Sequence, residues 1–91
     1  MGAIADRIRS KLDEAFAPAR LEVQDDSAKH KGHSGAREGG ESHFSVRIVS
    51  SRFEGLNRVA RQRLVNAALA EELAGPVHAL AILAQSPAEA G

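Results

Sequence analysis

One stretch near the C-terminal end, residues 52–82, constrains the fold more than any other part of the chain. Asn57 is a good N-cap for a helix, because its side-chain oxygen can accept from an unpaired amide of the first turn. Gly75 suits the left-handed position just past a helix end, and Pro76 prevents the helix from continuing. The stretch therefore predicts one long helix between Asn57 and Gly75, whose apolar stripe consists of Val59, Ala60, Leu64, Val65, Ala68, Leu69 and Leu73.

The apolar segment after Pro76, residues 77–83 (VHALAIL), is too short for a good helix and is bounded by Gly-Pro and Ser-Pro. It predicts a strand that is buried on both faces. His78 lies at the start of this strand, in otherwise apolar surroundings. A histidine in such a place is either a hydrogen-bonded structural residue or a functional one, and its position alone leaves both interpretations open.

The charges on the long helix oppose the helix dipole. Three arginines, Arg58, Arg61 and Arg63, lie in the first two turns, and Glu71 and Glu72 lie near the end. The dipole favours the reverse arrangement by roughly 0.3–1 kcal/mol per well-placed charge. Such a misfit suggests that the three arginines form a docking face for a partner or for nucleic acid. The alternative is that they only keep an exposed face soluble.

The rest of the chain predicts a small α+β fold. Residues 3–16 have apolar side chains at helical spacing, residues 20–24 and 42–49 alternate as two antiparallel strands, and residues 50–55 form a short helical turn. The strand at 77–83 follows a helical crossover, which favours a parallel place beside the strand at 42–49. We therefore expect a three-stranded mixed sheet with the helices packed on one face.

The segment between the first two strands, residues 25–41, has no periodicity and contains His30 and His33. A connection of this length is either functional or mobile, and four glycines favour a flexible loop. The spacing of the two histidines can bind metal, but it is a weak signal, and incidental histidines in a polar loop are the more common explanation. The tail, residues 86–91, predicts a last helical turn, capped by Ser86, that then frays.

Composition limits the possible functions of the chain. Its 91 residues fit one domain, and 12 basic residues balance 12 acidic ones, so it lacks the broad positive field of a dedicated nucleic-acid binder. It contains no cysteine, so a metal site must use imidazole or carboxylate ligands, or thiolates from a partner. We expect no membrane span, and a cytoplasmic location is the default.

Other chemistry has little support in the sequence. His43 alternates out of the apolar face of its strand, which predicts a solvated or edge residue. Nucleophile and phosphate-binding motifs are missing, and the chain has neither tryptophan nor tyrosine on which bases could stack. We therefore do not expect an enzyme.

Three segments together resemble the BolA family: DDSAKHKGHSG (25–35), SHFSVRIVSSRFEGLNRVARQRLVNAALAEEL (42–73) and PVHALAI (76–82). The most specific motifs are F-x-G before the long helix, R-x-R-x-V, L-A-E-E-L and V-H-A-L. The resemblance covers nearly the whole chain, so residues 1–91 are expected to form one BolA-like domain. It implies an αββααβ fold of the class II KH type, without the GXXG loop of true KH domains.

The resemblance also implies a role as an iron–sulfur adaptor. Family members bind monothiol glutaredoxins and share a labile 2Fe–2S cluster, which the glutaredoxin holds with a cysteine and glutathione. By this resemblance His78 is one ligand, and His30 is the second, with His33 as the alternative. Imidazole in place of thiolate makes such a cluster labile and raises its potential, which suits iron homeostasis or cluster trafficking. No cofactor is expected in the isolated protein, which we expect to be a monomer or weak homodimer.

The chain departs from the family at one position. Members read R-H-R where this chain has Arg61, Gln62 and Arg63, and glutamine cannot titrate. The alternative function is a DNA-binding transcription regulator that uses the helix-turn-helix-like region 50–73 and the three arginines at phosphates.

Overall fold

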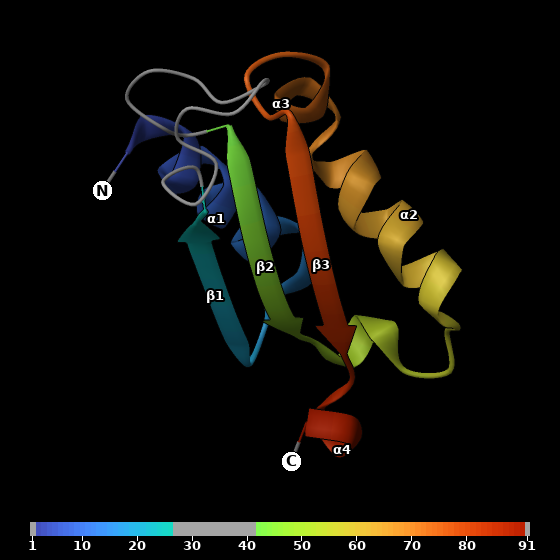
Figure 1. The fold of residues 1–91 in the computed structure, drawn as a ribbon. Coiled ribbons are helices and arrows are strands. Elements are labelled where there is room, and N and C mark those ends of the chain that lie inside the picture. Colours follow the sequence, from blue (N-terminus) through green and yellow to red (C-terminus); the bar gives the residue numbers. More distant parts are fainter. Residues whose placement is uncertain (1, 27–41, 91) are drawn as a thin grey trace.

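The computed structural model describes residues 2–26 and 42–90 (Figure 1). The segment with His30 and His33 lies outside the described residues, so its expected flexibility is not tested. The elements follow in the order α1 (Ala3–Phe16), β1 (Arg20–Asp25), β2 (His43–Val49), the 3-10 helix η2 (Ser51–Phe53), α2 (Arg58–Ala68), α3 (Ala70–Ala74), β3 (Ala79–Gln85) and α4 (Pro87–Ala90).

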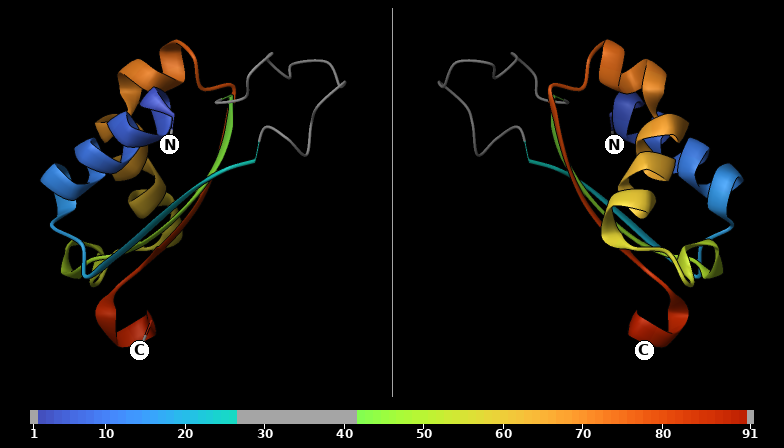
Figure 2. Two further views of the ribbon diagram at one scale, coloured as in Figure 1. Left: turned by 90° about the vertical axis from the view of Figure 1, so that its left-hand side faces the viewer. Right: turned by 90° about the vertical axis from the view of Figure 1, so that its right-hand side faces the viewer.

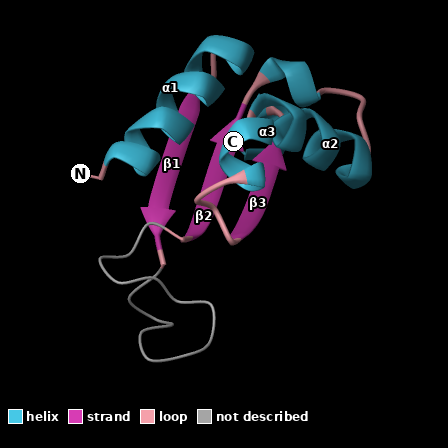
Figure 3. Ribbon diagram, turned by 90° about the horizontal axis from the view of Figure 1, so that it is seen from above, coloured by secondary structure: helices cyan, strands magenta, loops and turns pink. Residues whose placement is uncertain are grey.

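The three strands form one mixed sheet in the order β1-β2-β3. β1 pairs with β2 antiparallel, with Val23 opposite Val46, and β2 pairs with β3 parallel, with His43 opposite Ala79. Figures 2 and 3 show α1, α2 and α3 on one face of this sheet, while no described helix covers the other face. The predicted α+β architecture and the parallel third strand are therefore confirmed.

The core lies between the covered face of the sheet and the helices. Alternate residues of β2 point into it, and Phe44 and Ile48 are almost completely buried there. Phe53 in η2 packs on Phe16 of α1 with ring centroids 5.0 Å apart. This contact fixes the short turn ahead of α2 to the core and so sets where α2 begins.

The predicted long helix is interrupted at Leu69, which separates α2 from α3. Leu69 has φ −109° and ψ 23°, and its amide is shared between the carbonyls of Val65 and Asn66. Leu69 is still buried, so the apolar stripe runs through the break and periodicity alone does not reveal it. Gly75 has φ −116°, so the prediction of a left-handed residue there was wrong.

Strand β3 begins at Ala79, two residues later than predicted, and only one of its faces is covered. Leu80, Ile82 and Ala84 pack against the core. Ala79, Ala81 and Leu83 point to the face without a described helix, and 52% of Leu83 is exposed. The prediction of a strand buried on both faces was therefore wrong, because the helices cover one side of the sheet.

The C-terminal residues form helix α4 just beyond the end of β3, where the sequence predicts a turn that frays (Figure 1). Ser86, which precedes the helix, is buried. Within the described ranges 2–26 and 42–90, no helix has the length and apolar character needed to cross a membrane.

Candidate functional site

His78 lies immediately before β3 and its side chain is exposed. Its backbone amide donates to the carbonyl of Ser42 at 2.7 Å, and the amide of Ala79 donates to the same carbonyl at 3.1 Å. These two bonds tie the start of β3 to the residue before β2. The position of His78 is thus set by the parallel pairing of the two strands.

A second histidine, His43, lies beside His78. The two ring centroids are 5.3 Å apart, and the ring planes make an angle of 56°. His43 is 9% exposed, and its Nδ1 is 2.9 Å from the hydroxyl of Ser42, which is fully buried. The prediction that His43 is a solvated or edge residue was wrong, because β2 is the central strand and β3 begins next to His43.

The structure therefore brings His78 together with His43 and gives no test of His30 or His33. The sequence does indicate that His43 and His78 could meet, because each lies near the start of its strand and parallel pairing of the strands at 42–49 and 77–83 aligns those starts. The sequence does not predict the register of the two strands, which places His43 opposite Ala79.

The metal-ligating side chains near His78 fit a site that another molecule completes better than a site formed by the described residues alone. Within residues 2–26 and 42–90, no three or more histidine, cysteine, aspartate or glutamate side chains are grouped so that they could hold a metal ion. The chain has no cysteine, and among residues 2–26 and 42–90 the imidazoles of His43 and His78 lie together at this corner of the sheet. Tetrahedral coordination needs four ligands, so the described residues alone do not complete such a site.

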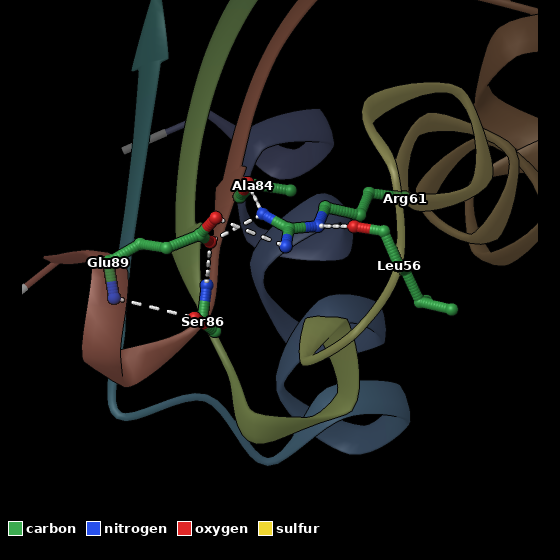
Figure 4. A network of polar contacts seen from close by, with 5 residues as sticks. All are labelled: Leu56, Arg61, Ala84, Ser86 and Glu89. Atoms are coloured by element: carbon green, nitrogen blue, oxygen red, sulfur yellow. Dashed lines mark hydrogen bonds and ion pairs between the residues drawn. The ribbon is translucent and has the colours of Figure 1, made fainter.

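Arg61, predicted as a docking residue, is used inside the fold (Figure 4). Its Nε donates to the carbonyl of Leu56 at 2.8 Å, and its Nη1 donates to the carbonyl of Ala84 at 3.0 Å. The same guanidinium forms an ion pair with Glu89 at 2.6 Å, and the Arg61 side chain is only 13% exposed. Arg61 thus joins the loop before α2, the end of β3 and helix α4, so its guanidinium is engaged within the fold, and its docking role stays a prediction.

Glu89 completes this network as part of a capping box. The carboxylate of Glu89 accepts from the amide of Ser86 at 2.8 Å, and the Ser86 hydroxyl lies 3.4 Å from the amide of Glu89. The Arg61 hydrogen bond, followed by the Ser86 amide, lowers the pKa of Glu89 from its usual 4.5 to about 2. The carboxylate is therefore ionised, and the network intact, throughout the physiological pH range.

Arg58 and Arg63 differ from Arg61. Both are exposed, and neither side chain forms a hydrogen bond or ion pair with any residue that the structure describes. A groove of about 560 Å³ lies between the start of α2 and the end of β3, and Arg58, Gln62 and Leu83 line it. Of the three arginines, these two remain candidates for a docking face, and Gln62 opens onto the same groove.

Tertiary contacts also account for the glutamates that oppose the helix dipole. Because the helix breaks at Leu69, Glu71 and Glu72 lie in the first turn of α3, where negative charge is favourable. Glu72 is fully buried and accepts from Arg7 at 2.8 Å and from Lys11 at 3.0 Å. Burial raises the pKa of Glu72, but the hydrogen bond from Lys11 and its other partners outweigh burial, and the net change is downward. The placement of the two glutamates therefore reflects stability and is no evidence for docking.

Comparisons with known proteins agree with this architecture. The family model of BolA-like protein matches residues 12–89. BolA-like protein 1 from Homo sapiens is 53% identical over 89 residues, which cover 98% of this chain and 62% of the relative. The chain thus spans less than two thirds of that relative's length. The DNA-binding transcriptional regulator BolA from Vibrio cholerae is 51% identical over 79 residues, covering 87% of this chain and 71% of the relative.

Solved structures give the same result. The BolA domain of SufE1 from Arabidopsis thaliana superposes with a TM-score of 0.88 at 45% identity, and the match covers 98% of each chain. The Mus musculus BolA1 protein has a TM-score of 0.82 at 48% identity, over 98% of this chain and 69% of the mouse chain. In fold and in sequence, over nearly its whole length, the chain belongs to the BolA-like family.

Proposed function

We propose that this protein is an iron–sulfur adaptor that binds a monothiol glutaredoxin and shares a labile 2Fe–2S cluster with it. In this complex His78 ligates one iron, and the glutaredoxin cysteine and glutathione ligate the other. The cluster supplies a redox-active and releasable iron centre. Its output is iron homeostasis or the transfer of the cluster to other proteins.

One observation carries the proposal. His78 is exposed at the start of β3 and has a second imidazole beside it, in a chain that contains no cysteine. Two neutral imidazoles on one iron raise the reduction potential and leave the cluster more labile than thiolate ligands do. An incomplete, open ligand set is what a protein needs if it receives and releases a cluster only when a partner is bound.

Mixing the purified protein with cluster-loaded monothiol glutaredoxin tests the proposal. We expect visible absorption and circular dichroism to change until the two proteins are present in equal amounts, because a new ligand set alters the iron-centred transitions. His78→Ala should remove this change, whereas Glu14→Ala, at another exposed site that belongs to no candidate docking face, should leave it intact. An unchanged spectrum with the wild-type protein would rule out the adaptor function.

A DNA-binding regulator is the second candidate, and the name of the Vibrio cholerae relative favours it. Exposed Arg58 and Arg63 on one side of α2 are the residues suited to contact phosphates. Each phosphate contact contributes about −0.9 to the slope of log K against log salt concentration. If both arginines contact phosphates, an Arg58→Ala and Arg63→Ala double variant should make that slope shallower by about 2, measured by gel shift on a duplex from the gene's own upstream region. Equal binding by wild type and double variant excludes this mode.

Several properties of the proposed adaptor stay predictions. They are the cytoplasmic location, the absence of enzymatic activity and the monomeric or weakly dimeric free state. One relative, 46% identical over 87 residues, is named as a chloroplastic protein of Arabidopsis thaliana, so location varies among relatives. A pull-down from the source cells followed by fractionation identifies both partner and compartment.

A further inference from the structure

We infer that the outer edge of β3 binds an extended peptide with an acidic side chain, which adds to the sheet as a fourth strand. The order β1-β2-β3 leaves this edge of β3 without a neighbouring strand among the described residues. The edge lies beside the groove at the end of β3, whereas His78 precedes the start of the strand. The inference is therefore independent of the proposed cluster and gives the protein a second binding surface.

Alternate residues of β3 direct their backbone groups away from β2. The amide of Ala79 donates to the residue before β2, and the carbonyl of Gln85 accepts from the residue after it. Because backbone groups alternate along a paired strand, every second residue between these two also bonds to β2. The amides and carbonyls of Leu80, Ile82 and Ala84 therefore point outward. No described residue forms a hydrogen bond with these groups of Leu80 and Ile82.

One outward carbonyl shows how such a group is paired in this fold. The carbonyl of Ala84 accepts from Arg61 at 3.0 Å, so a side chain of α2 supplies the donor that a neighbouring strand would supply (Figure 4). Within residues 2–26 and 42–90, the outward groups of Leu80 and Ile82 have no such partner. A strand that adds at this edge would pair both residues with its own amides and carbonyls.

Strand β3 lacks the features that protect an edge strand from pairing. Charged side chains and prolines are the usual protection against an added strand. The other edge strand, β1, contains Arg20, Glu22 and Asp25. The sequence of β3, ALAILAQ, contains neither a charged residue nor a proline. Of the two edges of the sheet, that of β3 is therefore the one suited to pairing.

The groove favours a single extended strand over a second copy of this chain. Figures 1 and 3 show α2 alongside the outer edge of β3. Leu56 and Gln62 on one side and Ile82 on the other line the groove between them. A lone strand can enter this groove, whereas β3 of a second copy would bring its own α2 against this one.

The charges of the groove favour an acidic peptide. Three charged residues line it, namely Arg58, Arg61 and Glu89. Glu89 forms an ion pair with Arg61, so no described residue compensates the positive charge of Arg58. A carboxylate on the peptide beside the end of β3 would compensate it.

Amide hydrogen exchange of the ¹⁵N-labelled protein, followed by nuclear magnetic resonance, tests the inference. The probe is a peptide of about seven residues in which valine and threonine alternate around one central aspartate. At saturation we expect it to slow the exchange of the outward amides of Leu80 and Ile82 about tenfold or more. The amides of Ala81 and Leu83 already bond to β2, so they should change less than about twofold and also report that the fold is intact. The same peptide with proline at alternate positions cannot donate and should slow neither outward amide.

A charge exchange tests the choice of an acidic peptide. Arg58→Glu should weaken binding of the aspartate peptide about fivefold, the upper end for an exposed ion pair, and should strengthen binding of its lysine counterpart. Arg20→Glu makes the same change on the opposite edge strand and should leave both affinities unchanged.

Three results would overturn the inference. The first is that the peptide leaves the exchange of the Leu80 and Ile82 amides unchanged. The second is that these amides exchange slowly without peptide and lose that protection on dilution, which would identify a second copy of the chain as the occupant. The third is that a single-stranded oligonucleotide protects them and the peptide does not, which would identify nucleic acid as the occupant.

Discussion

The Arg61 network gives the sharpest prediction on stability, because the sequence assigns this residue to docking and the structure assigns it to the fold. We replace Arg61 by alanine, which removes the guanidinium that joins Leu56, Ala84 and Glu89. The matched control is Arg63→Ala, which removes the same charge from an exposed site of the same helix.

The expected loss follows from two hydrogen bonds. Charge-assisted bonds contribute about 1.5–3 kcal/mol each, and the lower value applies here because water in the adjoining groove can reach the carbonyls that Arg61→Ala exposes. The ion pair with Glu89, which is about half exposed, adds little because solvent screens it. We therefore expect Arg61→Ala to lower the free energy of unfolding by about 3 kcal/mol, and Arg63→Ala by less than about 0.5 kcal/mol.

Urea unfolding followed by far-ultraviolet circular dichroism at neutral pH measures both values. Arg61→Lys tests whether the shape of the guanidinium matters in addition to its charge. One ammonium group cannot bond the carbonyls of both Leu56 and Ala84 as the planar guanidinium does. We expect it to lose about half as much stability as Arg61→Ala. If Arg61→Ala is no less stable than Arg63→Ala, then the network does not stabilise the fold, and Arg61 returns as a docking candidate.

Three further changes test other parts of the fold. Because Arg61 and then the Ser86 amide lower the pKa of Glu89 to about 2, the stabilisation from this carboxylate is complete above its usual pKa of 4.5 and is lost as the pH falls toward 2. The side-chain ¹³C shift of Glu89 should titrate near 2 in the wild type and at a higher pH in Arg61→Ala, where the Ser86 amide still lowers the pKa. Glu72→Gln should cost about 2 kcal/mol, below the usual range for a broken buried pair because Arg7 and Lys11 are partly exposed, whereas Glu71→Gln should change the unfolding free energy by less than about 0.5 kcal/mol. Gly55→Ala should cost about 1 kcal/mol, because Gly55 has φ 77°, although a methyl group would meet no atom within 4 Å.

Much of the fold follows from the sequence because its signals are local. The period of the apolar residues in 3–16 and the alternation in 42–49 fix α1 and β2, and the helical crossover fixes the parallel pairing of β3. The break at Leu69 does not follow, because the apolar stripe continues through it. The exposed face of β3 does not follow either, since its alanines do not distinguish one covered face from two.

The candidate site was only half predictable, for a similar reason. His78 stands out by its place after Gly75 and Pro76, which is a local signal. The burial of His43 and its contact with His78 depend on the register of two strands that are far apart in the sequence, which no local pattern encodes. The role of Arg61 within the fold was not predictable either, because the carbonyls of Leu56 and Ala84 become its partners only once β3 has packed beside α2.

Native mass spectrometry of the mixture with cluster-loaded glutaredoxin tests the central claim most directly. The account predicts one species that contains one copy of this chain, one glutaredoxin, one glutathione and one 2Fe–2S cluster. His78→Ala should abolish the cluster-containing species, while Glu14→Ala, at an exposed site outside the candidate docking face, should preserve it. A cluster-containing complex that persists in His78→Ala, or its absence with the wild-type chain, would contradict the account.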